Sequence, residues 1–430
     1  MIYQLISGTI EVWPSQGTGS FQLRQKKMGG NVRHTTWTTL PAWTYNNAEF
    51  LALEKEAIFM RTWQLVGHVS ELERPGDYLR FDLLGESAIV LRDLEGNLRA
   101  FHNVCRHRAF RLLGKPAGHC DGLIRCRYHG FTYELKGRLI AVPGEQEFDG
   151  IDKSELGLVP IEMDVFLGFV FIRFADDGGP RVAEQLAPFR DALALYRTEE
   201  MVPFGATSTT EIRADWKVAV DNNVEAYHVP IGHPGLQRLY GTTYTLEVQP
   251  LGVSRGGGPL RDQVSTNWSE RHYQKLLPDV AHLPLERKRA WLYYSVFPNL
   301  AFDIYPDMID YFQYLPIAPG RSVARSRTFV LADSRREMRA ARYLNMRINR
   351  QVALEDVELV EGVQHGLGSR SYHFGPLSRK EARVRQFQEL IVKRIPVAAC
   401  IDPPEAGTVA TRNLQLAAAP VEPSHASVPV

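Results

Sequence analysis

The sequence predicts an α+β protein with two domains, an antiparallel β-rich domain followed by a domain of mixed helices and strands. Short segments with alternating apolar residues, at 77–83, 88–92 and 98–103, are separated by glycine-containing turns, which is typical of an antiparallel sheet. The pattern changes after residues 176–180, a stretch rich in Asp, Gly and Pro that we interpret as a linker.

Further β segments extend the first domain up to the linker. We expect strands at 123–126, 131–134, 139–142 and 168–174, with Lys136–Gly137 as a hairpin turn. A helix precedes this sheet over 46–63, because apolar residues recur there at helical spacing after Asn46 and Asn47, either of which could cap its N-terminus.

The second domain combines long helical patterns with strands. The predicted helices cover 182–196, 215–227, 335–364 and 378–395. The predicted strands cover 291–297, 300–304 and 309–316. Residues 1–38 lack periodicity and are expected to be a poorly ordered lead, and residues 397–430, rich in Ala, Pro and Val, are expected to be a disordered tail.

Composition excludes several classes of function. The 430 residues carry 50 Lys and Arg against 49 Asp and Glu, so no basic field favours nucleic acid. The longest apolar runs are far shorter than the roughly 20 residues of a membrane helix. The first 13 residues lack the basic and apolar regions of a secretory signal, and we expect a soluble cytoplasmic protein.

Clustered cysteine and histidine indicate a metal site in the β-rich domain. Cys105 and His107 are followed, after eighteen residues, by Cys126 and His129. Two thiolates and two imidazoles could bind zinc tetrahedrally, or a two-iron, two-sulfur cluster in which the thiolates hold one iron and the imidazoles the other.

The residues around these pairs resemble the Rieske motif of ring-hydroxylating oxygenases, which favours iron and sulfur over zinc. The resemblance covers residues 103–108 and 126–133 and continues upstream through 63–68 and 92–101. Arg127 stands where the family usually has Pro, and Phe131 where it usually has Trp. Neither position carries a ligand, so these departures affect the loops and not the cluster.

A second site is expected at His228 and His233, which lie five positions apart near the end of a predicted helix. Two imidazoles and one carboxylate form the facial triad of non-haem ferrous oxygenases, which leaves coordination positions open for dioxygen. The pair alone is weak evidence, because two histidines near a helix end can be structural. Its spacing, about a hundred residues after a Rieske motif, resembles the mononuclear-iron motif of the same family.

The resemblance also implies the third ligand and the groups around the iron. Its acidic ligand lies shortly before a Val-Gln-x-Gly-Leu run, which assigns Asp356, with Glu355 as the fallback. In the family, the position of Glu225 bridges the iron site of one subunit to the Rieske cluster of its neighbour. Asp221 and Asn222, one turn earlier, are expected to support this bridge.

The resemblance therefore implies a Rieske domain at 39–175, whose N-terminal helix could pack on the catalytic domain. It implies a helix-grip catalytic domain at 176–396, a curved antiparallel sheet with helices. One 2Fe-2S cluster and one mononuclear Fe(II) are expected in each chain, with O2 as co-substrate. A ferredoxin and/or a flavin reductase would supply electrons from NAD(P)H, and a homotrimer is the simplest assembly.

The expected activity is that of a terminal oxygenase that hydroxylates, or oxidatively N- or O-dealkylates, an aromatic or other small organic compound. Cis-dihydroxylation of an aromatic ring is the alternative, and an electron-transfer Rieske protein without oxygenase activity is the alternative from another class. Aromatic residues between positions 268 and 314 could line an apolar pocket, form a cage for a cation, or simply fill the core of a sheet. These are Tyr273, Trp291, Tyr293, Tyr294, Phe297, Phe302, Tyr305, Tyr311 and Phe312.

Overall fold

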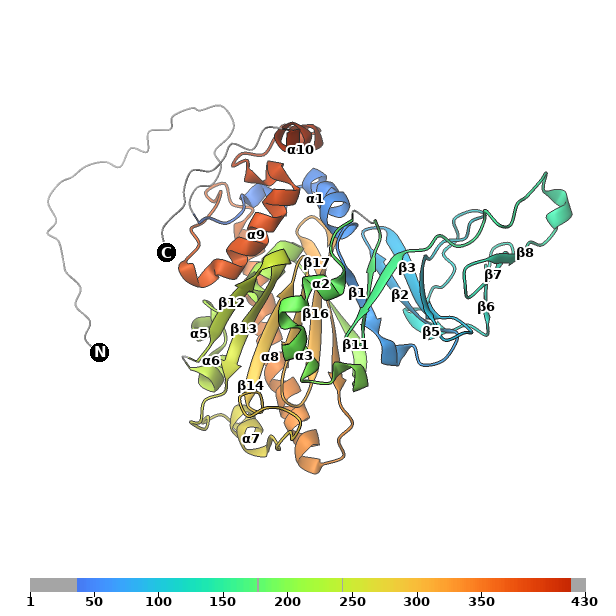
Figure 1. The fold of residues 1–430 in the computed structure, drawn as a ribbon. Coiled ribbons are helices and arrows are strands. Elements are labelled where there is room, and N and C mark those ends of the chain that lie inside the picture. Colours follow the sequence, from blue (N-terminus) through green and yellow to red (C-terminus); the bar gives the residue numbers. More distant parts are fainter. Residues whose placement is uncertain (1–36, 176–177, 242, 419–430) are drawn as a thin grey trace. The chain divides into compact units, whose positions relative to one another are not determined.

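The structure, a computed structural model, describes residues 37–175, 178–241 and 243–418 (Figure 1). Its four sheets are antiparallel and its helices gather in the second half of the chain, which confirms the predicted α+β class. Most of the expected lead at 1–38 lies outside the described residues. Trp37 and Thr38 are described, and Thr38 forms an isolated bridge with Pro376.

Three small sheets make up the first part of the chain. The strand order in one is β1-β10-β9, in the second β4-β3-β2-β5, and in the third β6-β7-β8. Their bounds are β1 Gln64–His68, β2 Asp77–Leu83, β3 Glu86–Arg92, β4 Leu98–His102, β5 Ala117–His119, β6 Leu123–Arg125, β7 Thr132–Glu134, β8 Leu139–Ala141, β9 Glu162–Phe166 and β10 Phe169–Arg173. Each predicted strand in this region is present within two residues of its expected bounds.

A seven-stranded antiparallel sheet organises the second part, in the order β11-β17-β16-β15-β14-β13-β12. Its bounds are β11 Val202–Ile212, β12 Thr245–Gln249, β13 Val253–Pro259, β14 Ala290–Val296, β15 Leu300–Ile304, β16 Ile309–Ala318 and β17 Arg321–Val330. Helices lie on both of its faces, and the long α8 runs along one of them (Figure 1). The helices are α1 Ala48–Glu54, α2 Val182–Gln185, α3 Arg190–Ala194, α4 Trp216–Asn223, α5 Val229–Gly232, α6 Pro234–Tyr240, α7 Trp268–Leu276, α8 Arg336–Gly366, α9 Ala382–Arg394 and α10 Val409–Ala418.

Strand alternation gives the large sheet two different faces. Leu292, Tyr294 and Phe302 belong to a core that also contains Phe169 and Leu186. Residues one position along the strands lie on the opposite face, because successive side chains of a strand alternate. Trp291 on that face packs in a second core with side chains of α6, α7 and α8. The metal ligands predicted for this part of the chain lie on or beside these helices.

Three predicted helices are shorter or broken. The helix expected over 46–63 is α1, which Asn47 caps, followed by a π-helical segment that ends at Phe59. The helix expected over 182–196 is divided into α2 and α3 by a 3-10 turn at Ala187–Phe189, with Pro188 at its start. A proline lacks the N–H that helix continuation needs. The helix expected over 215–227 is α4, which Asp215 caps by accepting from Lys217 N, and it ends at Asn223.

The expected disorder of 397–430 is wrong for the described residues up to Ala418. Helix α10 begins where Glu49 of α1 accepts hydrogen bonds from Gly407 N at 2.7 Å and Val409 N at 3.3 Å. Val409 is completely buried, and Asn413 accepts from Val397 N at 3.1 Å. These contacts with distant residues do not appear in local composition, and residues 419–430 lie outside the described part. No helix of the described residues is long and apolar enough to cross a bilayer.

Candidate metal and substrate site

His228, His233 and Asp356 meet although they come from separate elements. The two histidines flank the short helix α5, and Asp356 lies on α8. One ligand atom from each residue falls within 4.8 Å of the others. Asp356 Oδ1 lies 2.9 Å from His233 Nε2 and 3.7 Å from His228 Nε2. Pro230 starts a new turn between the histidines, and this turn aims both rings at the same carboxylate.

Other side chains hold each of the three ligands in place. His233 Nδ1 lies 2.9 Å from Glu355 Oε2, so Glu355 contacts the nitrogen that faces away from Asp356. Asn222 Nδ2 donates to Asp356 Oδ1 at 2.6 Å, and Glu225 Oε1 is hydrogen-bonded to His228 Nδ1. Partners of this kind fix the tautomer and orientation of metal-binding imidazoles.

The donor set fits a ferrous ion. Two imidazoles and one carboxylate converge, and 31% of the Asp356 side chain remains exposed, so the protein does not enclose the site completely. Although burial opposes protonation of His233, hydrogen bonds and charge from Asp356 and Glu355 raise its pKa. The site therefore favours positive charge.

Asp221 takes a different place from the one predicted. Its Oδ2 accepts from Gln388 Nε2 at 2.8 Å and from Tyr45 OH at 3.2 Å, which ties α4 to α9 and to the N-terminal segment. Burial raises the pKa of Asp221 to about 8. Of the two residues expected to support Glu225, Asn222 thus contacts the triad and Asp221 bonds to packing partners.

The four predicted cluster residues lie on two loops with matching hydrogen bonds. Cys105 N donates to Phe110 O and Cys126 N to Phe131 O, each at 2.8 Å. The thiols are 3% and 2% exposed, and the His107 and His129 rings lie 4.6 Å apart between centroids.

The hydrogen bonding of polar atoms at these loops shows whether an iron–sulfur cluster fits there. His107 Nδ1 is buried without a hydrogen-bond partner among the described residues, as a nitrogen reserved for a metal would be. Tyr133 OH lies 3.4 Å from Cys105 Sγ and accepts from Arg106 N at 3.0 Å. Two converging thiols and two imidazoles fit a Rieske cluster.

A cross-strand row of side chains lies on the sheet face opposite the Phe169 core. The strand register aligns Gly256, Tyr293, Asp303 and Asp310 on β13 to β16. Asp303 is 9% exposed, its Oδ2 accepts from Tyr305 OH at 3.3 Å, and its Oδ1 has no hydrogen-bond partner among the described residues. Burial and the charge of Asp310 raise the pKa of Asp303 well above its usual range, and Asp356 contributes to this shift.

Tyr240, Tyr293 and Tyr305 lie near this carboxylate. Trp291 lies 4.7 Å from Tyr305 between ring centroids, and the Tyr240 and Tyr293 hydroxyls are 3.0 Å apart. Tyr293 stays partly accessible although burial raises its pKa. Of the aromatics noted in the sequence, Tyr294, Phe302 and Tyr311 instead fill the opposite core. The sequence offered no signal for Asp303, because only the strand register brings it beside these rings.

Two family models match the chain. The Rieske [2Fe-2S] domain matches residues 62–159, and the catalytic domain of the ring hydroxylating alpha subunit matches residues 199–396. The first match contains the cysteine–histidine loops and the second contains the triad.

Curated relatives cover most of the chain. The carnitine monooxygenase oxygenase subunit of Acinetobacter pittii is 30% identical over 78% of this chain and 86% of its own length. The glycine betaine monooxygenase oxygenase subunit of Chromohalobacter salexigens is 28% identical over 79% and 82%.

Solved structures share the fold. A quaternary ammonium Rieske monooxygenase in complex with L-carnitine superposes with a TM-score of 0.69 at 26% identity, over 83% of this chain and 95% of that one. Naphthalene 1,2-dioxygenase from Rhodococcus sp. gives a TM-score of 0.69 at 22% identity, over 82% and 94%, a likeness of fold alone.

Proposed function

Because this chain belongs to the Rieske oxygenases, as an oxygenase subunit of the ring-hydroxylating alpha family, we propose that its two predicted ligand sets hold the metals of this family. Cys105, His107, Cys126 and His129 would hold the 2Fe-2S cluster, and His228, His233 and Asp356 the Fe(II). The enzyme is an oxygenase that uses O2 and electrons from a partner protein for monooxygenation. The bound iron would supply dioxygen activation, and the cluster would supply single electrons.

We propose a small organic cation as substrate and oxidative N-dealkylation as the reaction. The observation that carries this proposal is the buried Asp303 carboxyl beside Tyr293, whose Oδ1 lacks a partner among the described residues and which lies within electrostatic reach of Asp356. An alkylammonium group would compensate the buried carboxylate and contact the aromatic faces, which attract cations by about 0.5–2 kcal/mol each. The names of the relatives, which are carnitine and glycine betaine monooxygenases, agree with such a substrate.

The reaction balances without a further catalytic group. One atom of O2 enters a C–H bond of the N-methyl group, and the other leaves as water after two electrons from the reductase and two protons have been added. The resulting hydroxymethyl ammonium breaks its C–N bond, and the electron pair stays on nitrogen. Formaldehyde, a proton and a tertiary amine are the products. The chain's own residues therefore need only to orient the methyl group and exclude water.

Electron delivery is assigned to Glu225. Its carboxylate bonds to His228, and we propose that the cluster of a neighbouring subunit lies beyond it. We propose a homotrimer in which each active centre is built from two subunits. The electron donor would be a ferredoxin and/or a flavin reductase, and the assembly would act in the cytoplasm.

A reconstituted assay tests the proposed reaction. The holoenzyme is supplied with NADH, a surrogate reductase and either a trimethylammonium compound or its neutral tert-butyl isostere, and formaldehyde is followed. We expect formaldehyde in a 1:1 ratio with consumed O2 from the cation only. The Asp303→Asn variant should lose most of this preference, while Asp262→Asn, an exposed control, should keep it. With an aryltrimethylammonium probe, a ring diol without formaldehyde would instead establish cis-dihydroxylation.

A further inference from the structure

Arg383 is a buried cation without an anionic partner. It lies in the first turn of α9, where this helix meets the sheet, and is 1% exposed. Its Nε donates to Ser254 Oγ at 2.8 Å and its Nη2 to Ser295 Oγ at 2.6 Å. Its Nη1 has no aligned hydrogen-bond partner among the described residues, although the Tyr244 side chain is a close electrostatic neighbour, and no carboxylate of these residues lies within ion-pair distance of the guanidinium.

This arrangement is costly if nothing else binds there. Removing a guanidinium from water costs several kcal/mol unless a counter-charge and hydrogen bonds replace its hydration. Two serine hydroxyls supply hydrogen bonds but no negative charge, and burial lowers the pKa of Arg383. Arginine is almost never fully buried without a partner. An anion that binds at Nη1 would supply both the missing acceptor and the missing charge.

Arg383 faces the same region as Asp303. Ser254 and Ser295 form a cross-strand pair two residues from the pair of Gly256 and Tyr293, on the same face of the sheet. Asp303 and Glu225 are both electrostatic neighbours of Arg383, yet neither forms an ion pair with it. The protein therefore holds the Arg383 guanidinium and the Asp303 carboxyl near each other without an ion pair between them.

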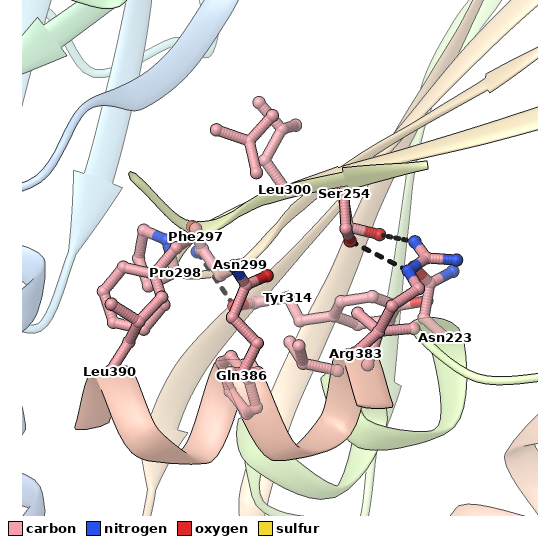
Figure 2. A pocket seen from close by; sticks show the side chains of 16 residues that line it. Asn223, Ser254, Phe297, Pro298, Asn299, Leu300, Tyr314, Arg383, Gln386 and Leu390 are labelled. Carbon is pink, nitrogen blue, oxygen red and sulfur yellow. Dashed lines mark hydrogen bonds between the residues drawn. The ribbon is translucent and has the colours of Figure 1, made fainter. Parts of the chain in front are cut away.

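The space beside Arg383 reaches the helix that leads to the metal ligands. A small recess of about 20 Å³ is lined by Arg383, by Asn223 and Val224 at the end of α4, and by Tyr314 (Figure 2). Figure 2 shows the Arg383 side chain extending from α9 toward Ser254 on the strand.

Gly256 leaves room for this arrangement. A Cβ atom at this position would lie 2.5 Å from Arg383 Nη1 and 2.3 Å from the Tyr244 hydroxyl. A side chain here would therefore displace the guanidinium or the phenol. Because Gly256 has no side chain, Arg383 Nη1 can occupy the space beside it.

We propose that Arg383 binds a carboxylate of the substrate, so that the enzyme acts on a zwitterion whose cationic end lies at Asp303. This inference rests on the proposed function, since it adds an anionic contact to the same substrate. Nη1 donates to the carboxylate, while Ser254 and Ser295 fix the guanidinium. An alcohol in place of the carboxylate would leave the buried charge unpaired, and the site would reject it.

Binding measured by calorimetry on the anaerobic holoenzyme tests the proposal, with glycine betaine and choline as probes. We expect the wild type to bind the betaine more tightly than choline. Arg383→Met should weaken betaine binding about 10- to 150-fold, the equivalent of losing a hydrogen bond to a charged group, and leave choline within about 2-fold. Arg383→Lys should restore part of the loss. Arg385→Met, on the same helix but paired with Glu389, is the control.

Three results would contradict the contact between Arg383 and a substrate carboxylate. A fourth would contradict the proposed function itself. Equal weakening of both probes in Arg383→Met would make Arg383 a structural residue. A wild type that does not distinguish betaine from choline would exclude the anionic contact even if the variant fails to fold. Binding of choline without betaine would leave the cationic site intact and remove only the anionic contact. Binding of neither probe would contradict the proposed function itself.

Discussion

Asn222 donates a 2.6 Å hydrogen bond to Asp356, to the same carboxylate oxygen that faces both histidines. The contact joins α4 to α8 across 134 positions of sequence. It uses one lone pair of this oxygen and so limits the rotation of the carboxylate. A ligand set that must hold iron on one side and stay open on the other needs such a constraint.

Replacing Asn222 with Ala should therefore weaken iron binding. We expect the affinity of the triad for Fe(II) to fall about 10- to 100-fold, as is typical when a group that orients a ligand is lost. Titration of apo-protein with Fe(II) under anaerobic conditions measures this change, and the cluster spectrum should stay the same. Glu358→Ala, an exposed change on α8, is the control. Unchanged affinity would mean that the hydrogen bond does not position Asp356.

Glu225→Gln should slow electron transfer and leave both metals bound. The amide keeps the size of the side chain but loses the negative charge that bonds to His228 Nδ1. We expect reoxidation of the reduced cluster, in the presence of O2 and substrate, to slow by at least ~10-fold. Stopped-flow absorbance follows this step. Glu225→Asp should be slowed less, and equal rates in all three proteins would remove Glu225 from the pathway.

Several features of the site could be predicted from sequence because they are local. Cys105 with His107, Cys126 with His129, and His228 with His233 are short motifs on single loops or turns. An acidic pair shortly before the Val-Gln-x-Gly-Leu run predicts Asp356. Asp303 and Arg383 could not be found, because each depends on the pairing of strands or the docking of a helix far away in sequence.

The secondary structure likewise contains elements that local sequence predicts and elements that depend on distant contacts. Alternating apolar residues predicted β2 and β16, whereas β17, which pairs with both β11 and β16, was missed. Its sequence carries Arg and Ser at alternate positions in place of apolar residues, and Arg325 reaches the Leu65 carbonyl at 2.9 Å. Helix α10 was missed because distant groups such as Glu49 complete its N-terminus.

Lys217→Met should destabilise the protein strongly. Lys217 Nζ lies 2.7 Å from both Glu54 Oε1 and Asp215 Oδ1, and all three side chains are buried. Removing the cation leaves two buried carboxylates uncompensated, which should cost about 3–5 kcal/mol in the free energy of unfolding. Urea denaturation measures this loss in the free energy of unfolding, and the variant Lys393→Met, at an exposed position on α9, is the control. A loss below ~1 kcal/mol would contradict this role of Lys217.

Asp221→Asn should change how stability depends on pH. Burial raises the pKa of Asp221 from 3.8 to about 8, so the native protein holds a proton that the unfolded chain releases above about pH 4. The free energy of unfolding therefore falls as pH rises toward 8, by up to about 1.4 kcal/mol per unit for one proton. In the variant this contribution disappears. Urea denaturation at pH 6, 7 and 8 compares the two slopes, and identical slopes would show that Asp221 is ionised in the fold.

Iron and labile-sulfide analysis of purified protein tests whether one chain carries two distinct iron centres on the named residues. We expect three irons and two labile sulfides per chain, with two irons and both sulfides in the cluster and one iron at the triad. His228→Ala should lose only the mononuclear iron and keep the Rieske spectrum. Zinc without labile sulfide in the wild type, or loss of sulfide in His228→Ala, would contradict the assignment of two separate iron centres.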